Sequence, residues 1–204
     1  MNGKLKNTTL ILGEGITEWY YIKSLQDVFK GLNFEPGYPK QTNLQELGMK
    51  IEEGIKNRYD RIFCLIDMDN KTEGKGKTEY NNFKKKYLNN KKCEIDFFET
   101  HRCTELFFLY YFQYTSRPYD NQPSLIKDLN KKVPYEKKEE FFKKCKGLHN
   151  YFEKNGGSLE DAISNANKSI KEKLRDNRDY TYSDIGKLIE KLEAQMKKAA
   201  SELN

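Results

Sequence analysis

Three carboxylates follow two short apolar segments, at positions where enzymes often place reactive groups. Glu14 lies one glycine after the apolar segment 8–12 and is flanked by two glycines, and Asp67 and Asp69 follow the segment 61–66, which is apolar after Arg61. Glycine permits a tight turn that leaves the Glu14 side chain projecting. Each apolar segment is typical of a parallel strand buried on both faces. Because the carboxyl ends of such strands meet at one edge of a sheet, we expect the three carboxylates to line one crevice.

Carboxylates gathered in one crevice repel one another and raise each other's pKa unless a cation neutralises them. Oxygen ligands with no His or Cys close by in the sequence favour Mg²⁺ or Mn²⁺. An Asp-x-Asp pair after a strand can also be a solvated turn, and Glu-Gly alone is a weaker signal still. The combination at two strand ends, separated by a strand–helix unit, is more specific and predicts a Mg²⁺ or Mn²⁺ site.

The elements that must position these residues alternate between strand and helix along the first half of the chain. This alternation predicts an α/β fold with a mostly parallel sheet flanked by helices and joined by right-handed crossovers. The expected strands are 8–12, a short one at 33–38, 61–66 and 93–99. The expected helices are 18–30 after an N-cap at Thr17, one after an N-cap at Asn43, and a basic helix at 78–88 that follows a polar loop at 71–77.

The second half of the chain has a different pattern. The aromatic segment 104–114 suits a helix packed at the end of the sheet, and 122–175 is a Lys-rich helical region. A last helix is expected from Ser183 to about Leu203, with Ser183 as its N-cap. We therefore predict a core of residues 1–115 and a C-terminal α-helical, Lys-rich extension of residues 116–204 packed on it.

Positive charge is concentrated in the middle of the chain. The net charge is +6, from 37 basic and 31 acidic side chains, and the segment from Lys71 to Asn150 alone holds 18 basic against 11 acidic residues. Such a surplus suits a polyanionic partner such as nucleic acid, although a solvated Lys-rich surface explains it equally well. The candidate nucleic-acid contacts are Lys84, Lys85 and Lys86 in the basic helix and His101 and Arg102 after the fourth strand.

Other sequence features exclude several classes of protein. The four cysteines are scattered without a CxxC pair, which argues against a zinc site or a disulfide framework. No apolar stretch resembles a signal peptide or is long enough to span a bilayer. We expect a soluble, cytoplasmic protein with no membrane partner.

Together, these motifs resemble the Toprim signature, and within that superfamily the RloB-like family, which is related to the OLD-type nucleases. The two specific motifs are Glu14-Gly-Ile-Thr-Glu18 and Leu65-Ile-Asp67-Met-Asp69. Less specific similarities are 103–112, 134–137, 162–168 and 182–192. The sequence departs from the family pattern where His101-Arg102 replaces Asn-Pro, Thr104 replaces Phe and Tyr111 replaces His.

The resemblance implies a Toprim-like (Rossmannoid) fold and a set of roles for the acids. Glu14 would be a metal ligand or the general acid/base, and Asp67 and Asp69 would be metal ligands. Glu18, one turn along the following helix, would hold a second ion. Its alternative role is that of a carboxylate stabilised by the helix N-terminus.

Two further residues depend mainly on the resemblance. Glu105 precedes an aromatic helix that should be buried, so its carboxylate needs a metal or Lys137 as a partner. Lys137 would then stabilise charge on a phosphate in the transition state. Because Lys137 lies in a Lys-rich run, a solvated surface position is the alternative.

The function that the resemblance implies is a Mg²⁺-dependent nuclease acting on DNA or RNA, with tRNA among the candidate substrates. Family members are associated with phage defence and abortive infection, often beside an ATPase partner encoded nearby. The chain has no P-loop, since Gly74-Lys-Gly-Lys77 does not match one. The alternatives are a catalytically silent Toprim scaffold that binds nucleic acid or a partner protein, and a nucleotidyl- or phospho-transfer enzyme. Whether the protein forms a homodimer stays open.

Overall fold

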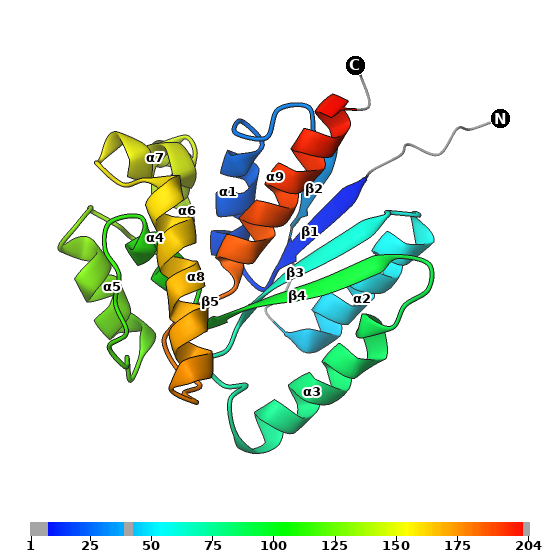
Figure 1. The fold of residues 1–204 in the computed structure, drawn as a ribbon, viewed down its shortest axis with the longest axis horizontal. Coiled ribbons are helices and arrows are strands. Elements are labelled where there is room, and N and C mark those ends of the chain that lie inside the picture. The colour runs from blue at the N-terminus through cyan, green and yellow to red at the C-terminus, as the bar shows by residue number, and fades with distance from the viewer. Residues whose placement is uncertain (1–7, 39–42, 202–204) are drawn as a thin grey trace.

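The computed structural model describes residues 8–38 and 43–201, and a five-stranded sheet forms their centre. The strand order is β2-β1-β3-β4-β5 (Figure 1), in which β5 alone runs antiparallel to its neighbour. The expected mostly parallel α/β fold is thereby confirmed. The strands are β1 Thr9–Gly13, β2 Phe34–Gly37, β3 Arg61–Asp67, β4 Glu94–His101 and β5 Tyr182–Ser183.

Helices cover both faces of the sheet. In Figure 1, α2 and α3 lie against one face and α1 and α9 against the other, while α4 to α8 gather beyond the carboxyl ends of the parallel strands. The helices are α1 Ile16–Leu25, α2 Leu44–Lys56, α3 Gly74–Leu88, α4 Glu105–Tyr110, α5 Gln122–Asn130, α6 Glu139–Cys145, α7 Leu148–Lys154, α8 Leu159–Arg175 and α9 Ile185–Ser201.

Successive strand residues point to opposite faces, so each apolar run contributes to two cores. In β3, Phe63 and Leu65 join the core under α1 and α9, whereas Ile62, Cys64 and Ile66 join the core under α2 and α3. All five are at most 1% exposed. This burial on both faces explains why the strand reads as a continuous apolar run.

Several element boundaries differ from those expected. Helix α1 begins at Ile16 after an N-cap at Gly15, and it ends at Leu25 rather than at residue 30. Helix α3 begins at Gly74, inside the segment expected to be a loop. The Asn43 N-cap is confirmed, because its side chain accepts the Glu46 backbone N–H at 2.8 Å.

The C-terminal region contributes more to the sheet than the division at residue 115 implies. Ser183, expected as an N-cap, lies in β5, where its hydroxyl hydrogen-bonds that of Thr100 at 2.8 Å. Strand β5 has two residues, too few for an alternating pattern to predict it. Helix α9 then packs on β4. Residues 116–201, the described part of this extension, therefore supply an edge strand and a covering helix as well as helices at the end of the sheet.

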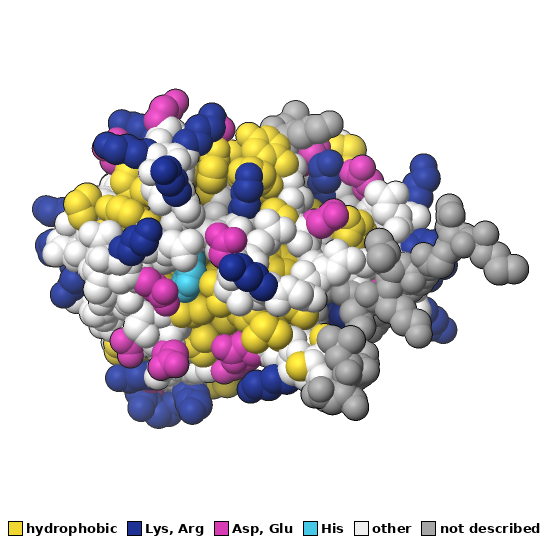
Figure 2. Space-filling model, turned by 90° about the horizontal axis from the view of Figure 1, so that it is seen from above, with side chains coloured by type: hydrophobic (Ala, Val, Ile, Leu, Met, Phe, Trp, Pro, Cys, Tyr) yellow, Lys and Arg dark blue, Asp and Glu magenta, His cyan; other side chains and the backbone are white. Residues whose placement is uncertain are grey.

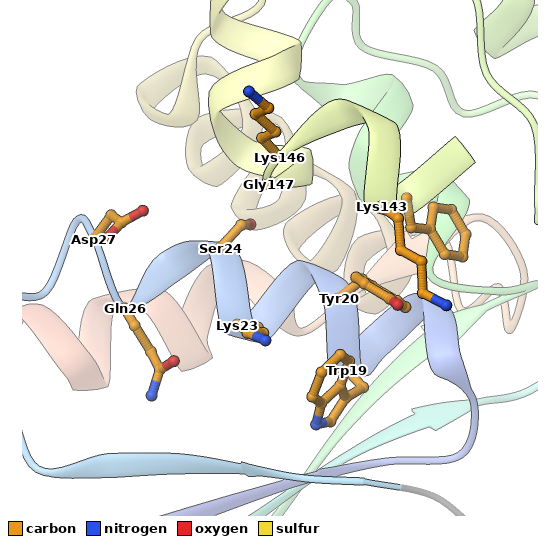
Figure 3. Close-up of a pocket in the computed structure, with 10 residues that line it drawn as sticks. Trp19, Tyr20, Lys23, Ser24, Gln26, Asp27, Lys143, Lys146 and Gly147 are labelled. Atoms are coloured by element: carbon orange, nitrogen blue, oxygen red, sulfur yellow. The ribbon is translucent and has the colours of Figure 1, made fainter. Parts of the chain in front are cut away.

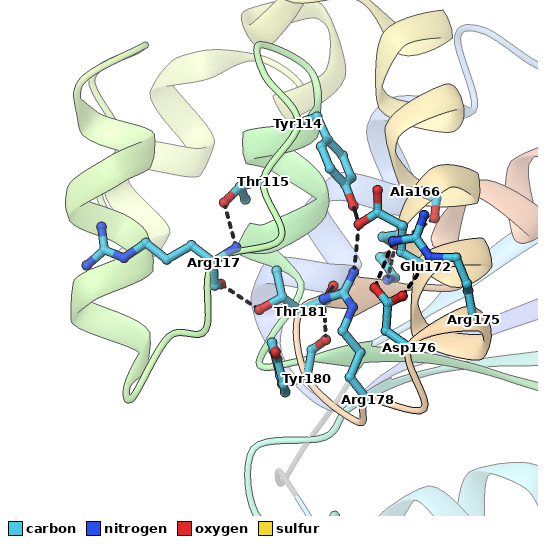
Figure 4. Close-up of polar contacts among 12 residues, drawn as sticks. Tyr114, Thr115, Arg117, Ala166, Glu172, Arg175, Asp176, Arg178, Tyr180 and Thr181 are labelled. Carbon is cyan, nitrogen blue, oxygen red and sulfur yellow. Dashed lines mark hydrogen bonds and ion pairs between the residues drawn. The ribbon is translucent and has the colours of Figure 1, made fainter.

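A network of polar contacts anchors the loop that leads into β5 (Figure 4). Arg178 donates to the Thr181 carbonyl at 3.0 Å and to Glu172 at 3.3 Å, and Glu172 also accepts the hydroxyl of Tyr114. The Thr181 hydroxyl donates to the Arg117 carbonyl at 2.7 Å. These contacts join the segment after α4 to the segment after α8.

Candidate active site

The strand order creates a topological switch point between β1 and β3. From these neighbouring strands the chain leaves in opposite directions, through α1 to β2 and through α3 to β4. Open α/β sheets bind their ligands in the crevice at such a point. Glu14 follows β1 and Asp67 ends β3, and the Asp67 backbone N–H donates to Glu14 Oε2 at 3.3 Å. The structure thus brings together the two strand ends that the sequence singled out.

Glu14 is held by a lysine that sequence reasoning did not identify. Lys71 Nζ lies 3.0 Å from Glu14 Oε1 and 3.1 Å from Oε2, 2.8 Å from the Asp67 carbonyl oxygen and 3.4 Å from Asn70 Oδ1. Four oxygens thus surround this ammonium group, which is largely buried. Burial raises the pKa of Glu14, and the Lys71 charge opposes that rise. Lys71 therefore occupies a cation position within the crevice.

Glu18 projects from the first turn of α1 and is 2% exposed. Its Oε2 accepts the Gly15 backbone N–H at 2.7 Å, the helix-start contact considered as its alternative role. Its Oε1 is buried without a hydrogen-bond partner in the part of the chain that the structure describes. The Thr104 hydroxyl lies nearby, but its single proton is donated to Asp67. Burial, followed by the charge of Glu105, raises the pKa of Glu18.

Asp67 is fixed by the start of α4. Its Oδ1 accepts the Thr104 backbone N–H at 2.9 Å and the Thr104 hydroxyl at 3.0 Å. Burial and then the charges of Glu18 and Glu105 raise the pKa of Asp67 well above its usual value. Asp67 is thus an oriented carboxylate in an electrostatically unfavourable environment.

Asp69 lies apart from Glu14, Glu18 and Asp67. The Met68 backbone N–H continues the pairing with β4 by donating to the Thr100 carbonyl at 3.0 Å, and the chain then turns at Asp69 and Asn70. The Asp69 side chain is exposed, and Arg102 contacts its backbone oxygen at 3.4 Å. This turn places Asp69 at the surface, outside the crevice in which we expected it.

Glu105 is fully buried at the start of α4 and has a complete set of partners. Its Oε1 lies 3.1 Å from Lys137 Nζ and accepts the Tyr135 hydroxyl at 3.0 Å, and its Oε2 accepts Gln122 Nε2 at 3.3 Å. Burial alone would lower the pKa of Lys137, but the charges of Glu105, Glu18 and Asp67 raise it overall. Lys137 is therefore charged and borders the crevice.

We call Glu14, Glu18, Asp67 and Glu105 the acid cluster. Its members differ in their counter-charges, since Lys71 neutralises Glu14 and Lys137 neutralises Glu105. Among the described residues, no three His, Cys, Asp or Glu side chains lie in an arrangement that could hold a metal ion. Mg²⁺, however, is commonly held by one or two carboxylates together with waters and substrate phosphate. Glu18, with its unpartnered oxygen, and Asp67 fit that requirement.

Two of the three candidate lysines of α3 are paired with acids on the neighbouring elements α2 and β4. Lys84 is half-buried and paired with Glu99, and Lys86 lies 3.1 Å from Glu52. Lys85 is exposed. Basic and acidic side chains are likewise interleaved on the face that carries α1 and α9 (Figure 2). Much of the basic surplus on α3 is therefore balanced locally.

His101 and Arg102 have structural partners as well. The His101 ring is 7% exposed, accepts the Thr181 backbone N–H at Nδ1 over 3.2 Å and stacks on Tyr182. Arg102 Nε donates to the Tyr119 carbonyl at 3.0 Å and is partly exposed. Because its ring is enclosed, His101 does not present a surface for nucleic acid, whereas part of Arg102 is accessible.

The fold and the site define an α/β protein with a buried acidic crevice at the switch point of its sheet. A profile of the family described as RloB-like protein matches residues 9–192, from β1 into α9. The chain therefore belongs to the RloB-like family. No curated protein and no solved structure gives a significant match. None of the helices among the described residues is long and apolar enough to cross a membrane.

Proposed function

We propose that the chain is a Toprim-type, Mg²⁺- or Mn²⁺-dependent nuclease that hydrolyses phosphodiester bonds of DNA or RNA at the acid cluster. The observation that carries this proposal is the Glu18 carboxylate, which is buried with one oxygen unpartnered beside Asp67. An ionised carboxylate without a counter-charge is costly to bury. A divalent cation would remove that cost, and a nuclease needs one at this place.

Each residue of the crevice has a distinct role in the proposed reaction. Glu18 and Asp67 would hold the ion, which when bound supplies an activated water and stabilises charge on the phosphate. Lys137 borders the same crevice and can donate to a non-bridging phosphate oxygen. Glu14, whose pKa is raised by burial, can accept a proton from the attacking water, while Lys71 keeps its carboxylate oriented.

Membership of the RloB-like family supports two further parts of the proposal. The biological role would be phage defence by abortive infection, and tRNA is one candidate substrate. Because the sequence has no P-loop, any ATP-driven step would come from an ATPase partner encoded nearby.

The second candidate function is a scaffold that binds nucleic acid or a partner protein without cleaving it. The observation that favours it is the presence of Lys71 and Lys137, which already neutralise half of the acid cluster. A scaffold would need no further cation, whereas the nuclease would. Cation binding and cleavage therefore discriminate between the two functions.

The test is a cleavage assay with labelled single-stranded DNA, duplex DNA and tRNA, in Mg²⁺ or Mn²⁺, with and without the ATPase encoded beside the gene. Asp67→Asn should reduce the rate by about a hundredfold or more, comparable to the loss of one key electrostatic group in other enzymes. The matched control is Asp161→Asn, an exposed aspartate in the first turn of α8, which should keep the full rate. Cleavage that survives Asp67→Asn, or no cleavage by the unmodified protein under any condition, would refute the proposed nuclease.

A further inference from the structure

A second hollow, distinct from the acidic crevice, opens between α1 and the turn that joins α6 to α7 (Figure 3). Its volume is about 500 Å³, within the range of small-ligand pockets in proteins. Three aromatic and three lysine side chains line it together with one acidic residue. They are Trp19, Tyr20, Phe142, Lys23, Lys143, Lys146 and Asp27.

The aromatic side of this pocket is held in place by its own contacts. Trp19 Nε1 donates to the Pro36 carbonyl at 3.2 Å, and its ring meets Tyr20 edge-on with the ring centroids 4.8 Å apart. Tyr20 in turn contacts Phe142 at 5.3 Å, and its hydroxyl donates to Glu139 at 3.1 Å. Trp19 and Tyr20 are only half-buried, so they offer rigid aromatic surface to a ligand.

The positive charges come from both walls of the pocket. Lys23 Nζ lies 4.7 Å from the centroid of the Trp19 ring, and Lys143 extends from α6 beside Tyr20 (Figure 3). Lys146 lies at the rim, in the left-handed turn that it forms with Gly147. All three lysines are exposed, and with Asp27 they give the lining a formal charge of +2. Glu139, just outside the lining, lies 3.1 Å from Lys143 and reduces the local charge to +1.

We propose that this pocket binds a nucleotide unit, with its base against Trp19 and Tyr20 and its phosphate at the lysines. Aromatic side chains stack on any base, and lysines attract phosphate without regard to sequence. The ligand is either a free nucleotide or one unit of a single strand. In its strand form the inference rests on the proposed nuclease function, whereas the free-nucleotide form does not.

Two elements lead from the acid cluster to this pocket, which favours the strand form. On α1, Glu18 directly precedes Trp19, and the rise of about 1.5 Å per residue places Ser24 roughly 9 Å further along the helix. Lys137, which contacts Glu105, comes just before α6, whose residues Phe142 and Lys143 line the pocket. A strand with one base in the pocket would thus lie along elements that also carry or contact members of the acid cluster.

The chain has a single tryptophan, Trp19, so its fluorescence reports directly on the pocket. We would titrate the intact protein in EDTA, where no cleavage occurs, with AMP, ATP, short oligothymidylate and inorganic tripolyphosphate. Quenching by the oligonucleotide alone assigns a strand subsite, and quenching by the mononucleotides as well assigns a nucleotide site. No change with any nucleotide or oligonucleotide, or an equal response to tripolyphosphate, would overturn the inference.

Lysine variants test whether the oligonucleotide binds at the pocket or at exposed lysines elsewhere on the protein. For a single strand, each phosphate contact contributes roughly 0.7 to the slope of the log binding constant against log salt concentration. Because the double variant Lys143→Ala with Lys146→Ala loses two contacts, it should flatten the slope for the oligonucleotide by about 1.4. The control pair Lys144→Ala with Lys154→Ala changes two exposed lysines outside the pocket and should leave the slope unchanged. Equal slopes for both pairs would refute the site.

A final variant tests the aromatic wall by anisotropy of a labelled oligonucleotide. Trp19→Leu should weaken binding roughly five- to 150-fold, the loss expected for one stacked base. Circular dichroism checks that this variant is folded. Because these measurements need no metal, their failure is distinct from a failure of the proposed cleavage, which Asp67→Asn tests separately.

Discussion

Replacing Glu18 by Gln should make the protein more stable and, at the same time, unresponsive to Mg²⁺. The substitution keeps the side-chain length and an oxygen that can accept the Gly15 N–H, which Glu18 contacts at 2.7 Å. It removes the charge of a carboxylate that is 2% exposed, has one unpartnered oxygen and lies near two other acids. The variant therefore removes electrostatic strain while preserving the local backbone contact.

The expected gain in stability equals the cost of burying the Glu18 carboxylate, which the substitution removes. Leaving a buried polar group unsatisfied costs about 1–3 kcal/mol, and more when the group is charged. We therefore expect Glu18→Gln to raise the free energy of unfolding by about 1–3 kcal/mol in EDTA at about pH 8, where Glu18 is most strongly ionised. For a domain of this size that corresponds to a rise in Tm of roughly 2–12 °C.

The pH dependence of stability independently tests whether Glu18→Gln stabilises the protein. Because the folded-state pKa of Glu18 is raised, the folded protein binds more protons than the unfolded chain between the ordinary and the raised pKa. The metal-free wild-type protein thus gains stability as the pH falls through the raised pKa, and loses it as the pH rises. The advantage of Glu18→Gln should accordingly shrink toward about pH 5.

Urea unfolding of both proteins, with EDTA and with Mg²⁺, measures these differences. At a hundredfold excess of Mg²⁺ over its Kd the wild-type protein should gain about 2.7 kcal/mol, and Glu18→Gln should gain much less. A variant that is less stable than the wild-type protein in EDTA would refute the electrostatic reasoning. A variant that keeps the full Mg²⁺ response would show that Glu18 does not hold the ion.

Three more predictions follow from the same region and from the core. Lys71→Met leaves Glu14 buried without its ion pair and should cost about 3–5 kcal/mol in urea unfolding, part of which Mg²⁺ restores. Gly13→Ala would place a Cβ 2.2 Å from the Glu18 Cβ, so it should cost about 1–3 kcal/mol and weaken the Mg²⁺-induced rise in Tm. His149 is buried and its pKa is lowered by that burial, so below about pH 6.5 the unfolded chain binds a proton that the folded protein does not. His149 should therefore reduce stability as the pH falls, and His149→Gln should flatten that part of the profile.

Each of these predictions has an outcome that contradicts it. Unchanged stability of Lys71→Met would mean that the four oxygens around the ammonium group do not need its charge. A Gly13→Ala variant with an intact Mg²⁺ response would contradict the reasoning that the added Cβ displaces the Glu18 side chain. For His149, the difference between the wild-type and variant pH profiles isolates the histidine from the acids, and a flat difference would contradict its low folded-state pKa.

The sheet was predictable because its strands are buried on both faces. The run 62–66 has no polar position, and the carboxylate that follows it marks the strand end at the crevice. The alternation of such runs with helical segments then indicates parallel pairing. By contrast, β5 depends on contacts between residues 80 or more positions apart, such as Thr100 with Ser183, which no local pattern records.

The site was predictable only in part, for a similar reason. Glu14 and Asp67 follow strands directly, so the sheet fixes where their carboxylates lie. The positions of Asp69 and Lys71 depend on a turn after β3 that carries one side chain out to solvent and returns the other to Glu14. In the sequence Lys71 is one lysine in a polar loop, and only the shape of this turn distinguishes it.

The charges of the crevice indicate how many divalent ions the proposed metal site would hold. The four carboxylates of the acid cluster carry a formal charge of −4 when ionised, and Lys71 and Lys137 supply +2. The remaining −2 equals the charge of one divalent ion, and it falls on the two members of the cluster that have no lysine of their own. A second divalent ion would have to displace one of the lysines, both of which make close contacts with carboxylate oxygens. For the proposed metal site, this arrangement therefore favours one ion, with Lys71 in the place that a second ion would otherwise occupy.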